Sequence, residues 1–463
     1  MRLIYRIKQL LLATGDFLCF VFGFWLSLWL RYLEIPEWTQ IERHLSLFFW
    51  LFIFWILIIF INGLYDLAHL RQENYKRHFI ETTLLSLILS TIFFYLLSTK
   101  NITPKTILLL NVIIGFSLSF IWRLIYNKYL NANTLKTKII FIGYTPESAE
   151  LIKILENYPE RGYQITGLVD LENKTTTNQY HFFETFTSLN DLDVVAQKLK
   201  TSIFIVANHL KKDEEVSKQL FKIFFSSKIK IIDLNSFYEV ITGRIPPSIF
   251  SEAWFLENLK TNEQPIYNKI KNLLDRFIGL IIFCLLIIIF PIFTIILKLT
   301  SPGPIFYKQI RVGKNGQEFT IYKFRSMHAL TADGGAEKSG FQFASKNDNR
   351  ITKFGKFMRK TRLDEVPQCL NLLKGELALI GPRPERPEVV AEIIKLMPYY
   401  PLRLTVKPGL TGWAAINQNY TDTLESTLQK LQYDIFYIKN QSPLLDLVII
   451  LRTINLVLRM KGQ

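Results

Sequence analysis

Cysteine and histidine are scarce in this chain of 463 residues. The three cysteines, Cys19, Cys284 and Cys369, stand far apart, and two of them lie in apolar runs, which excludes a disulfide framework and a zinc site of paired cysteines. The six histidines are scattered and form no ligand cluster. Charged residues make up only 20% of the chain, whereas 49% of it is hydrophobic and 37 residues are Phe. This composition indicates extensive contact with lipid and disfavours a soluble protein.

Negative charge is also in short supply, because the chain carries a net charge of +16 at neutral pH. Residues 264–463 alone hold 28 Lys and Arg against 15 Asp and Glu. We therefore expect an anionic partner for the C-terminal part. The length also exceeds what one core accommodates, so we expect several domains.

Four apolar runs open the chain, at residues 9–30, 46–63, 79–98 and 106–125. Each run is about 18 to 22 residues long, enough to cross a hydrocarbon core of about 30 Å. Basic residues precede the first run, separate the second from the third and follow the fourth, which places both ends of this region in the cytoplasm. The sequence therefore predicts a four-helix transmembrane domain over residues 1–130.

Residues 136–260 change character and predict a small α/β domain in the cytoplasm. Short β-rich runs alternate here with helical patterns at 146–157 and 212–226, and the runs are Ile139–Gly143, Tyr163–Asp170, Ser202–Ala207 and Lys228–Leu234. A dinucleotide-binding fold needs three glycines in the turn after its first strand, and only Gly143 is present here. Asp170, at the end of the second run, is placed to be the ribose-binding acid of such a fold. We interpret the domain as a degenerate Rossmann-like, CoA-binding-like fold used for regulation or assembly.

A fifth apolar segment, residues 277–299, is long enough to span the bilayer. Basic residues flank it on both sides, so the positive-inside rule keeps both ends in the cytoplasm, and Pro291 supplies a bend. We predict a proline-broken re-entrant membrane helix, with a straight span as the alternative. Tyr267 and Lys271, just before it, have the spacing of a dehydrogenase pair, which we interpret as chance.

Cations and tight turns follow this segment. Ser301–Pro304 predicts a stiff turn, and Gly313 and Gly316 bracket a hairpin loop. Three cations in and beside this hairpin could converge on a phosphate, namely Arg311, Lys323 and Arg325. The alternative for each cation is adhesion to anionic lipid.

Two adjacent acids, Asp364 and Glu365, come directly after an amphipathic pattern that starts at Ile351. One carboxylate is suited to attack phosphorus while its neighbour holds Mg²⁺, and the surrounding cations are expected to keep both acids ionised. The alternative is a solvated helix end. The rigid turn Gly381–Pro384 then presents Arg383, and a second turn covers residues 408–413.

These motifs, in this order, resemble the bacterial sugar transferase family of monotopic phosphoglycosyl transferases over about residues 265–463. With the preceding regions, the chain is similar to the long polyisoprenyl-phosphate hexose-1-phosphate transferases, of the undecaprenyl-phosphate glucose phosphotransferase type, that start exopolysaccharide, capsule or lipopolysaccharide O-antigen synthesis. The expected fold is therefore a membrane protein of α and α/β type, with a catalytic domain at residues 265–463.

The resemblance implies a two-step reaction in which Asp364 attacks a UDP-sugar, releases UMP and passes the sugar phosphate to undecaprenyl phosphate. It assigns Glu365 to Mg²⁺, Arg359 to a phosphate near the membrane surface, and the Arg383–Pro384 turn to the nucleotide. For Arg311, Lys323 and Arg325 it matches motif positions only, as substrate-binding residues.

The resemblance also implies a multi-pass protein of the bacterial inner membrane with its catalytic domain on the cytoplasmic face, in contact with lipid and assembled as a homodimer. No nucleic-acid partner is expected. Two alternatives stay open at this point. One is a non-catalytic polysaccharide-assembly scaffold, and the other is a membrane-bound nucleotide-sugar dehydratase or epimerase, which the missing glycines disfavour.

Overall fold

The structure of the chain is a computed structural model that divides into two compact units, Met1–Thr242 and Gly243–Gln463. It describes residues 2–65, 75–97, 105–130, 136–172, 183–189, 192–226, 229–259, 264–331, 333, 350–418 and 423–458. Two predicted features lie partly outside these ranges, namely the basic stretch between the second and third apolar runs, at Arg71, and the start of the fourth β-rich run, at residue 228.

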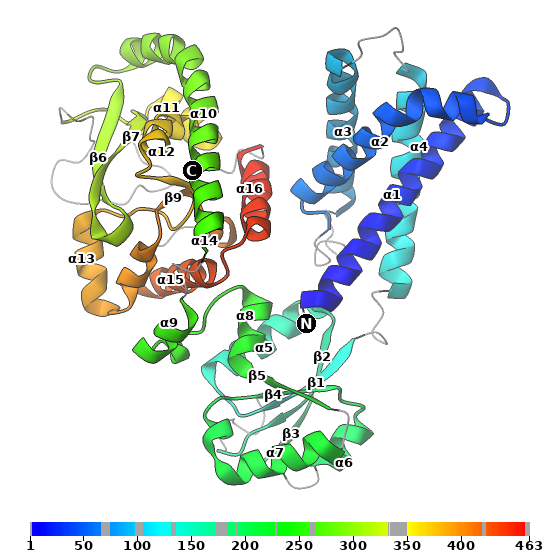
Figure 1. Cartoon of the computed structure of the whole chain (residues 1–463), viewed down its shortest axis with the longest axis vertical. Coiled ribbons are helices and arrows are strands. Elements are labelled where there is room, and N and C mark those ends of the chain that lie inside the picture. Colours follow the sequence, from blue (N-terminus) through cyan, green and yellow to red (C-terminus); the bar gives the residue numbers. More distant parts are fainter. Residues whose placement is uncertain are drawn as a thin grey trace. The chain divides into compact units, whose positions relative to one another are not determined.

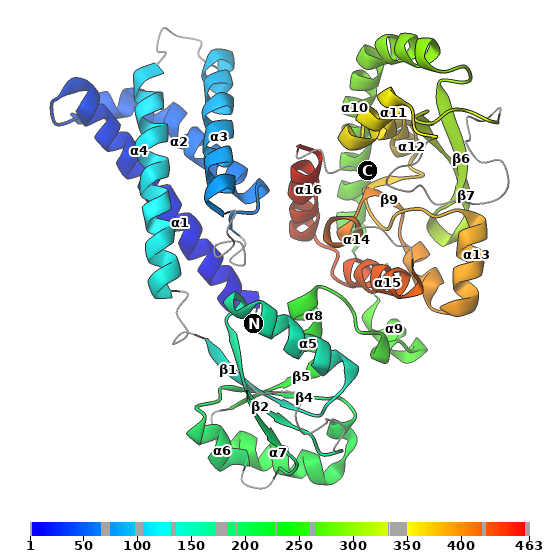
Figure 2. The same ribbon diagram turned by 180° about the vertical axis from the view of Figure 1, so that it is seen from behind.

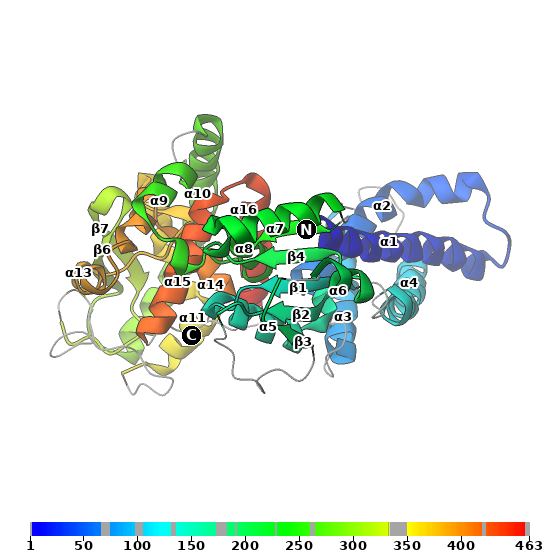
Figure 3. The same ribbon diagram turned by 90° about the horizontal axis from the view of Figure 1, so that it is seen from below.

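Four long apolar helices begin the first unit, and each is long and apolar enough to cross a membrane. They are α1 (Arg2–Tyr32), α2 (Trp38–Ile61), α3 (Tyr75–Leu97) and α4 (Lys105–Ile125), which continues into a π-helical turn at Tyr126–Leu130. Helix α1 packs against both α2 and α4 and lies between them in the view from below (Figure 3). The chain is therefore a membrane protein.

Aromatic side chains fill the interior of this helical bundle. The ring of Phe20 lies 5.0 Å from the rings of both Trp55 and Phe116, which joins α1 to α2 and α4. Helices α1 and α4 approach closely at two small residues, since a Cβ atom on Gly23 would lie 2.9 Å from the Cα atom of Gly115. Small residues allow such backbone approach between membrane helices.

A buried ion pair also connects α1 to α4. The side chains of Asp16 and Arg123 are both 0% exposed, and Arg123 Nε donates to Asp16 Oδ1 at 3.2 Å. Arg123 Nη1 donates to the Leu64 carbonyl at 2.8 Å and to the Tyr75 hydroxyl at 2.9 Å, while Ser119 Oγ donates to Asp16 at 2.6 Å. Because an uncompensated charge inside a bilayer is costly, these partners are what permit the pair there.

A five-stranded parallel sheet forms the rest of the first unit, with the strand order β3-β2-β1-β4-β5. Its strands are β1 (Thr137–Ile142), β2 (Tyr163–Val169), β3 (Glu184–Phe186), β4 (Ile203–Val206) and β5 (Lys230–Asp233). Its helices are α5 (Pro146–Asn157), α6 (Leu192–Lys198), α7 (Glu214–Ser226) and α8 (Leu234–Thr242). Helices α6 and α7 cover one face of the sheet and α5 and α8 the other (Figures 1 and 2).

The second unit surrounds two small two-stranded sheets, an antiparallel β6-β7 pair and a parallel β8-β9 pair. Its strands are β6 (Phe306–Val312), β7 (Glu318–Phe324), β8 (Ala378–Ile380) and β9 (Gly409–Thr411). Its helices are α9 (Glu252–Asn258), α10 (Pro265–Thr300), α11 (Lys353–Thr361), α12 (Cys369–Lys374), α13 (Pro387–Leu396), α14 (Trp413–Asn417), α15 (Leu424–Lys439) and α16 (Pro443–Leu458). Single 3₁₀ turns include η8 (Leu363–Gln368) and η9 (Tyr400–Thr405).

One boundary differs from the expected domains. Residues 243–259, which we assigned to the α/β domain, belong to the second unit. The reason is apolar packing, because Ile245 and Phe255 lie in the core of that unit and the ring of Phe255 is 5.2 Å from that of Tyr399.

The fifth apolar segment is part of α10, which remains helical through Pro291. The helix bends toward its C-terminal end, as the proline predicts (Figure 1), but it is continuous there, so the expected interruption is wrong. A proline removes one backbone hydrogen bond and commonly kinks a helix without ending it. The bent region exposes apolar side chains, such as Ile288 at 69% and Ile295 at 61%, which suits a lipid environment. Its re-entrant course stays a prediction.

The Asp16–Arg123 pair yields a stability prediction. Arg123→Leu leaves the Asp16 carboxylate buried without its partner and should lower the free energy of unfolding by about 3–5 kcal/mol. The double variant Asp16→Leu, Arg123→Leu removes both charges and should recover most of this loss. Thermal unfolding in one detergent, followed by circular dichroism, measures the difference. Equal losses in the single and double variants would contradict the account.

Candidate active site

The acidic pair is presented by the turn that follows α11. Thr352 caps this helix, with its hydroxyl accepting from Gly355 N at 2.9 Å. Gly355 is required there because a Cβ atom would lie 1.9 Å from the Ser326 carbonyl oxygen. The helix ends at Arg362 in the left-handed region, with φ of 56°, and the 3₁₀ turn η8 then carries Asp364 and Glu365.

The β6-β7 hairpin supplies the first cation of the site, as the glycine spacing predicts for the hairpin itself. Lys323, near the end of β7, donates from Nζ to Glu365 Oε1 at 2.8 Å. The side chains of both residues are largely buried, at 18% and 11% exposed. A buried ammonium group thus meets a buried carboxylate.

Two arginines complete the surroundings of Glu365. Arg362 Nη1 lies 3.5 Å from Glu365 Oε2, and Arg383 Nη2 lies 3.4 Å from Glu365 Oε1. Glu365 therefore contacts three cations that come from the hairpin, from the end of α11 and from the turn after β8. Arg359 is half-buried on α11, and its charge is near enough to Asp364 to act on that carboxyl.

The two acids differ in their affinity for protons. Burial, and next the charge of Glu365, raise the pKa of Asp364 to about 6. Burial also opposes the ionisation of Glu365, but Lys323, Arg383 and Arg362 outweigh it and hold the pKa of Glu365 well below its ordinary value. The cations therefore do not hold the pKa of Asp364 below its ordinary value as they do for Glu365, although a pKa of about 6 still leaves both acids mostly ionised at neutral pH.

A buried ion pair fixes the turn that carries Arg383. The side chains of Arg403 and Asp434 are each 2% exposed and lie 2.8 Å apart, and Arg403 Nη2 also donates to the Arg383 carbonyl at 2.9 Å. The turn passes so close to β9 that a Cβ atom on Gly409 would lie 2.0 Å from Gly381 N. Sequence reasoning missed Arg403 and Asp434.

Arg311 binds the same turn from the hairpin side. Its Nη1 donates to the Pro384 carbonyl at 3.0 Å and lies 3.5 Å from Glu385 Oε2. Burial opposes the ionisation of Glu385, but Lys430, Arg403 and Arg311 outweigh it and lower its pKa to about 2. Arg311 and Pro384 are thus brought to the turn that presents Arg383.

Arg325 does not join this group, so the expected convergence of three hairpin cations is wrong for this residue. Its guanidinium donates to the carbonyls of Ser301 at 2.7 Å and Pro302 at 2.6 Å, and the residue is 2% exposed. The physical reason is that β7 ends at Phe324. Side chains alternate between the two faces only within a strand, so Arg325 need not lie on the same face as Lys323. Arg325 secures the turn after α10.

The pair that we interpreted as chance has a structural role at the start of α10. Tyr267 OH donates to Asp446 Oδ2 at 2.7 Å and Lys271 Nζ lies 2.8 Å from the same atom, which ties α10 to α16. Asp275 accepts from Leu379 N at 3.0 Å and ties α10 to β8. The membrane helix is therefore connected to the strand that precedes the Arg383 turn.

Metal binding at the site is limited by the number of carboxylates. Within the ranges that the structure describes, no group of three or more His, Cys, Asp and Glu side chains gathers to hold an ion. Asp364 and Glu365 fit a Mg²⁺ ion that is bound by one or two carboxylates and completed by substrate phosphates, which is how proteins commonly hold it. They do not fit an ion held by protein ligands alone.

Comparison with known proteins gives consistent matches. A family model described as bacterial sugar transferase matches residues 266–460. The chain is 31% identical over 335 residues to a UDP-glucose:undecaprenyl-phosphate glucose-1-phosphate transferase of Klebsiella pneumoniae, which covers 69% of this chain and 67% of that protein. An uncharacterized sugar transferase of Haemophilus influenzae is 30% identical over 344 residues, which covers 70% of this chain and 69% of that protein.

A third relative matches more closely over a shorter length. The UDP-N-acetylgalactosamine-undecaprenyl-phosphate N-acetylgalactosaminephosphotransferase of Aeromonas hydrophila is 38% identical over 230 residues, which covers 50% of this chain. The match spans only 52% of that relative's own length.

The pKa difference within the acidic pair is testable without an activity assay. As the pH falls through about 6, Asp364 should take up a proton while Glu365 stays ionised. Infrared spectra of protein labelled with ¹³C-aspartate, compared with Asp364→Asn, measure this titration. Glu365→Gln should move it to lower pH by removing a negative charge, and Lys323→Met to higher pH by removing a positive one. Titration at the ordinary pKa of aspartate would contradict the assignment.

Proposed function

Because the chain belongs to the bacterial sugar transferase family, we propose that it transfers a sugar 1-phosphate from a UDP-sugar to undecaprenyl phosphate. The products are undecaprenyl-diphosphate-sugar and UMP. The observation that carries the proposal is the asymmetric acidic pair, in which Glu365 contacts three cations and its neighbour Asp364 has none within ion-pair distance among the described residues. The names of the relatives support the donor and acceptor classes.

The first step assigns Asp364 as the nucleophile. An oxygen of its carboxylate attacks the β-phosphorus of the UDP-sugar, the bond from that phosphorus to the bridging oxygen breaks, and UMP leaves with the electron pair. The sugar phosphate is then held as an acyl phosphate on Asp364. A pKa of about 6 suits this role, because the carboxylate is mostly ionised at neutral pH and retains basicity.

The second step regenerates the acid. A phosphate oxygen of undecaprenyl phosphate attacks the same phosphorus, and the bond from phosphorus to Asp364 breaks. Lys323 and Arg383 stabilise the negative charge of the phosphoryl oxygens in both steps, and Arg359 binds the incoming lipid phosphate. Mg²⁺, held by Glu365 and the donor phosphates, would supply further neutralisation of that charge.

The cytoplasmic face of the inner membrane is the proposed location of this chemistry. A UDP-sugar is soluble and undecaprenyl phosphate is embedded in lipid, so the two meet only at a surface. The exposed apolar face of α10 and the amphipathic α11, whose Phe357 is 49% exposed, support contact of this unit with that surface. A homodimer stays a prediction.

The two alternatives receive less support. A non-catalytic scaffold has no need of several cations around the acidic pair. Here Lys323, Arg362 and Arg383 all contact Glu365. A dehydratase needs a dinucleotide. The strand order β3-β2-β1-β4-β5 supports a Rossmann-like fold for residues 137–242, but Gly143 is the one glycine in the turn after β1.

Release of UMP from a panel of UDP-sugars tests the proposal. Purified protein in detergent with Mg²⁺ should release UMP continuously only when undecaprenyl phosphate is present. Asp364→Asn should lower this rate at least about a thousandfold, because the amide is a poor nucleophile. Glu318→Gln, an exposed acid at the start of β7, serves as the matched control and should keep the wild-type rate.

Two results would contradict the proposal. One is near-normal release of UMP by a folded Asp364→Asn protein, which would remove Asp364 as the nucleophile. The other is the absence of UMP release by the folded wild-type protein with every donor, which would favour the scaffold.

A further inference from the structure

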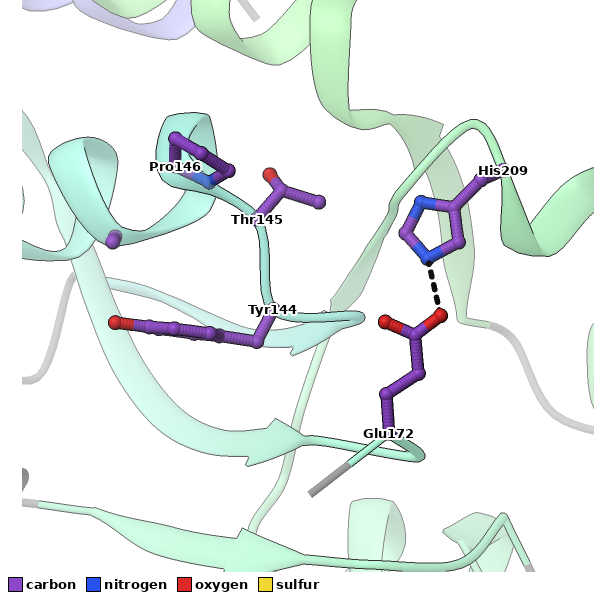
Figure 4. Close-up of a pocket in the computed structure, with 6 residues that line it drawn as sticks. Tyr144, Thr145, Pro146, Glu172 and His209 are labelled. Atoms are coloured by element: carbon purple, nitrogen blue, oxygen red, sulfur yellow. Dashed lines mark ion pairs between the residues drawn. The ribbon is translucent and has the colours of Figure 1, made fainter. Parts of the chain in front are cut away.

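A cavity of about 580 Å³, largely open to solvent, lies in the α/β part of the first unit, far along the chain from the acidic pair. It is lined by Tyr144, Thr145, Pro146, Ala149, Glu172 and His209 (Figure 4). These residues follow β1, β2 and β4, so the cavity lies at the carboxyl ends of three parallel strands. The strand order reverses between β1 and β4, and this switch point is where open parallel sheets bind ligands.

The cavity is poorly suited to a phosphate group. The cap of α5 already uses two of the N–H groups at this helix start, since Ser148 N donates to Thr145 Oγ1 at 3.2 Å and Thr145 N donates to Ser148 Oγ at 2.8 Å. Pro146 has no backbone N–H to offer. The acids Glu147, in that turn, and Glu172, in the wall, would repel an anion.

Gly143, the single glycine in the turn after β1, is explained by close packing and not by phosphate binding. Gly143 has φ of +97°, and a Cβ atom on it would lie 2.7 Å from the Cβ atom of Ala207 and 2.8 Å from Leu210 Cδ1. The absence of a side chain at Gly143 therefore allows the turn after β1 to pack closely against the segment after β4. A diphosphate site needs further glycines that this turn lacks.

The side chains that do line the cavity fit hydroxyl groups. Glu172 and His209 stand together on one side, with His209 Nε2 3.7 Å from Glu172 Oε1, and Tyr144, Thr145 and Pro146 form the other side (Figure 4). A carboxylate accepts hydrogen bonds from two adjacent hydroxyls, and an imidazole nitrogen adds a further donor or acceptor. The Tyr144 ring and Pro146 supply the apolar surface on which the C–H groups of a sugar can pack.

We propose that this cavity binds a neutral sugar ring through its vicinal hydroxyl groups, with Glu172 as their main acceptor. The ring belongs either to a nucleoside, as its ribose, or to a hexose of a glycan. Occupancy of this cavity would depend on the concentration of a nucleotide or of a glycan. It would not involve the chemistry at Asp364.

Ligand-observed NMR with the full chain in nanodiscs tests the proposal with pairs of ligands. Adenosine and uridine are each compared with the 2′-deoxynucleoside, and methyl α-glucoside with its 2-deoxy analogue. In at least one pair, the ligand with the intact diol should bind about tenfold more tightly, because a charged acceptor loses a hydrogen bond to the deoxy form. The nucleoside and glucoside arms distinguish the two sources of the ring.

Variants then assign the binding to this cavity. Glu172→Gln should weaken binding of the diol ligand about tenfold and abolish discrimination against the deoxy analogue, whereas Glu215→Gln, an exposed acid on α7, should change neither. Four results would each overturn the proposal. They are binding of the diol ligand that Glu172→Gln leaves unweakened, equal binding of diol and deoxy ligands by the wild-type protein, tighter binding of UMP than of uridine through a Glu172-dependent site, and no binding in either arm.

Discussion

The second unit depends on keeping one buried carboxylate charged. Removing a carboxylate from water costs several kcal/mol, and that cost is recovered only when cations and hydrogen bonds replace the lost solvent. Glu365 meets this condition through Lys323 from the hairpin, Arg362 from the end of α11 and Arg383 from the turn after β8. Two segments that are distant in sequence, the hairpin and the turn after β8, must therefore converge on the end of α11 and η8. The same convergence leaves Asp364 buried beside a negative charge, which is the condition that raises its pKa.

Further ion pairs hold these segments in place. Arg403 and Asp434 support the Arg383 carbonyl, while Arg311 and Lys430 share Glu385 in the same turn. The base of α10 is tied to α16 and β8 by Lys271 and Asp275. The proposed membrane helix and the proposed phosphate site thus belong to one connected structure, which holds Asp364 in a defined position relative to α10.

Much of this arrangement is predictable where the signal is local. The apolar runs predict the helices, and Gly313 and Gly316 predict the hairpin, whereas the contacts of Lys323 and Arg383 with Glu365 come from the tertiary structure. The errors arise where local patterns end. Arg325 is two residues after Lys323 but lies one residue beyond the end of β7, and α10 stays helical through Pro291, where an interruption was expected. The Arg403–Asp434 pair spans 31 residues with no motif to join its members, so only the tertiary structure reveals it.

The central claim is that Asp364 carries the sugar phosphate covalently between the two steps. Mass spectrometry of the acid-quenched protein, after incubation with a UDP-sugar and Mg²⁺ but without undecaprenyl phosphate, tests it most directly. The account predicts a mass increase of one sugar phosphate, located on the peptide that contains Asp364 and discharged when the lipid is added. UMP release in single turnover without any adduct, or an adduct on another residue, would contradict it.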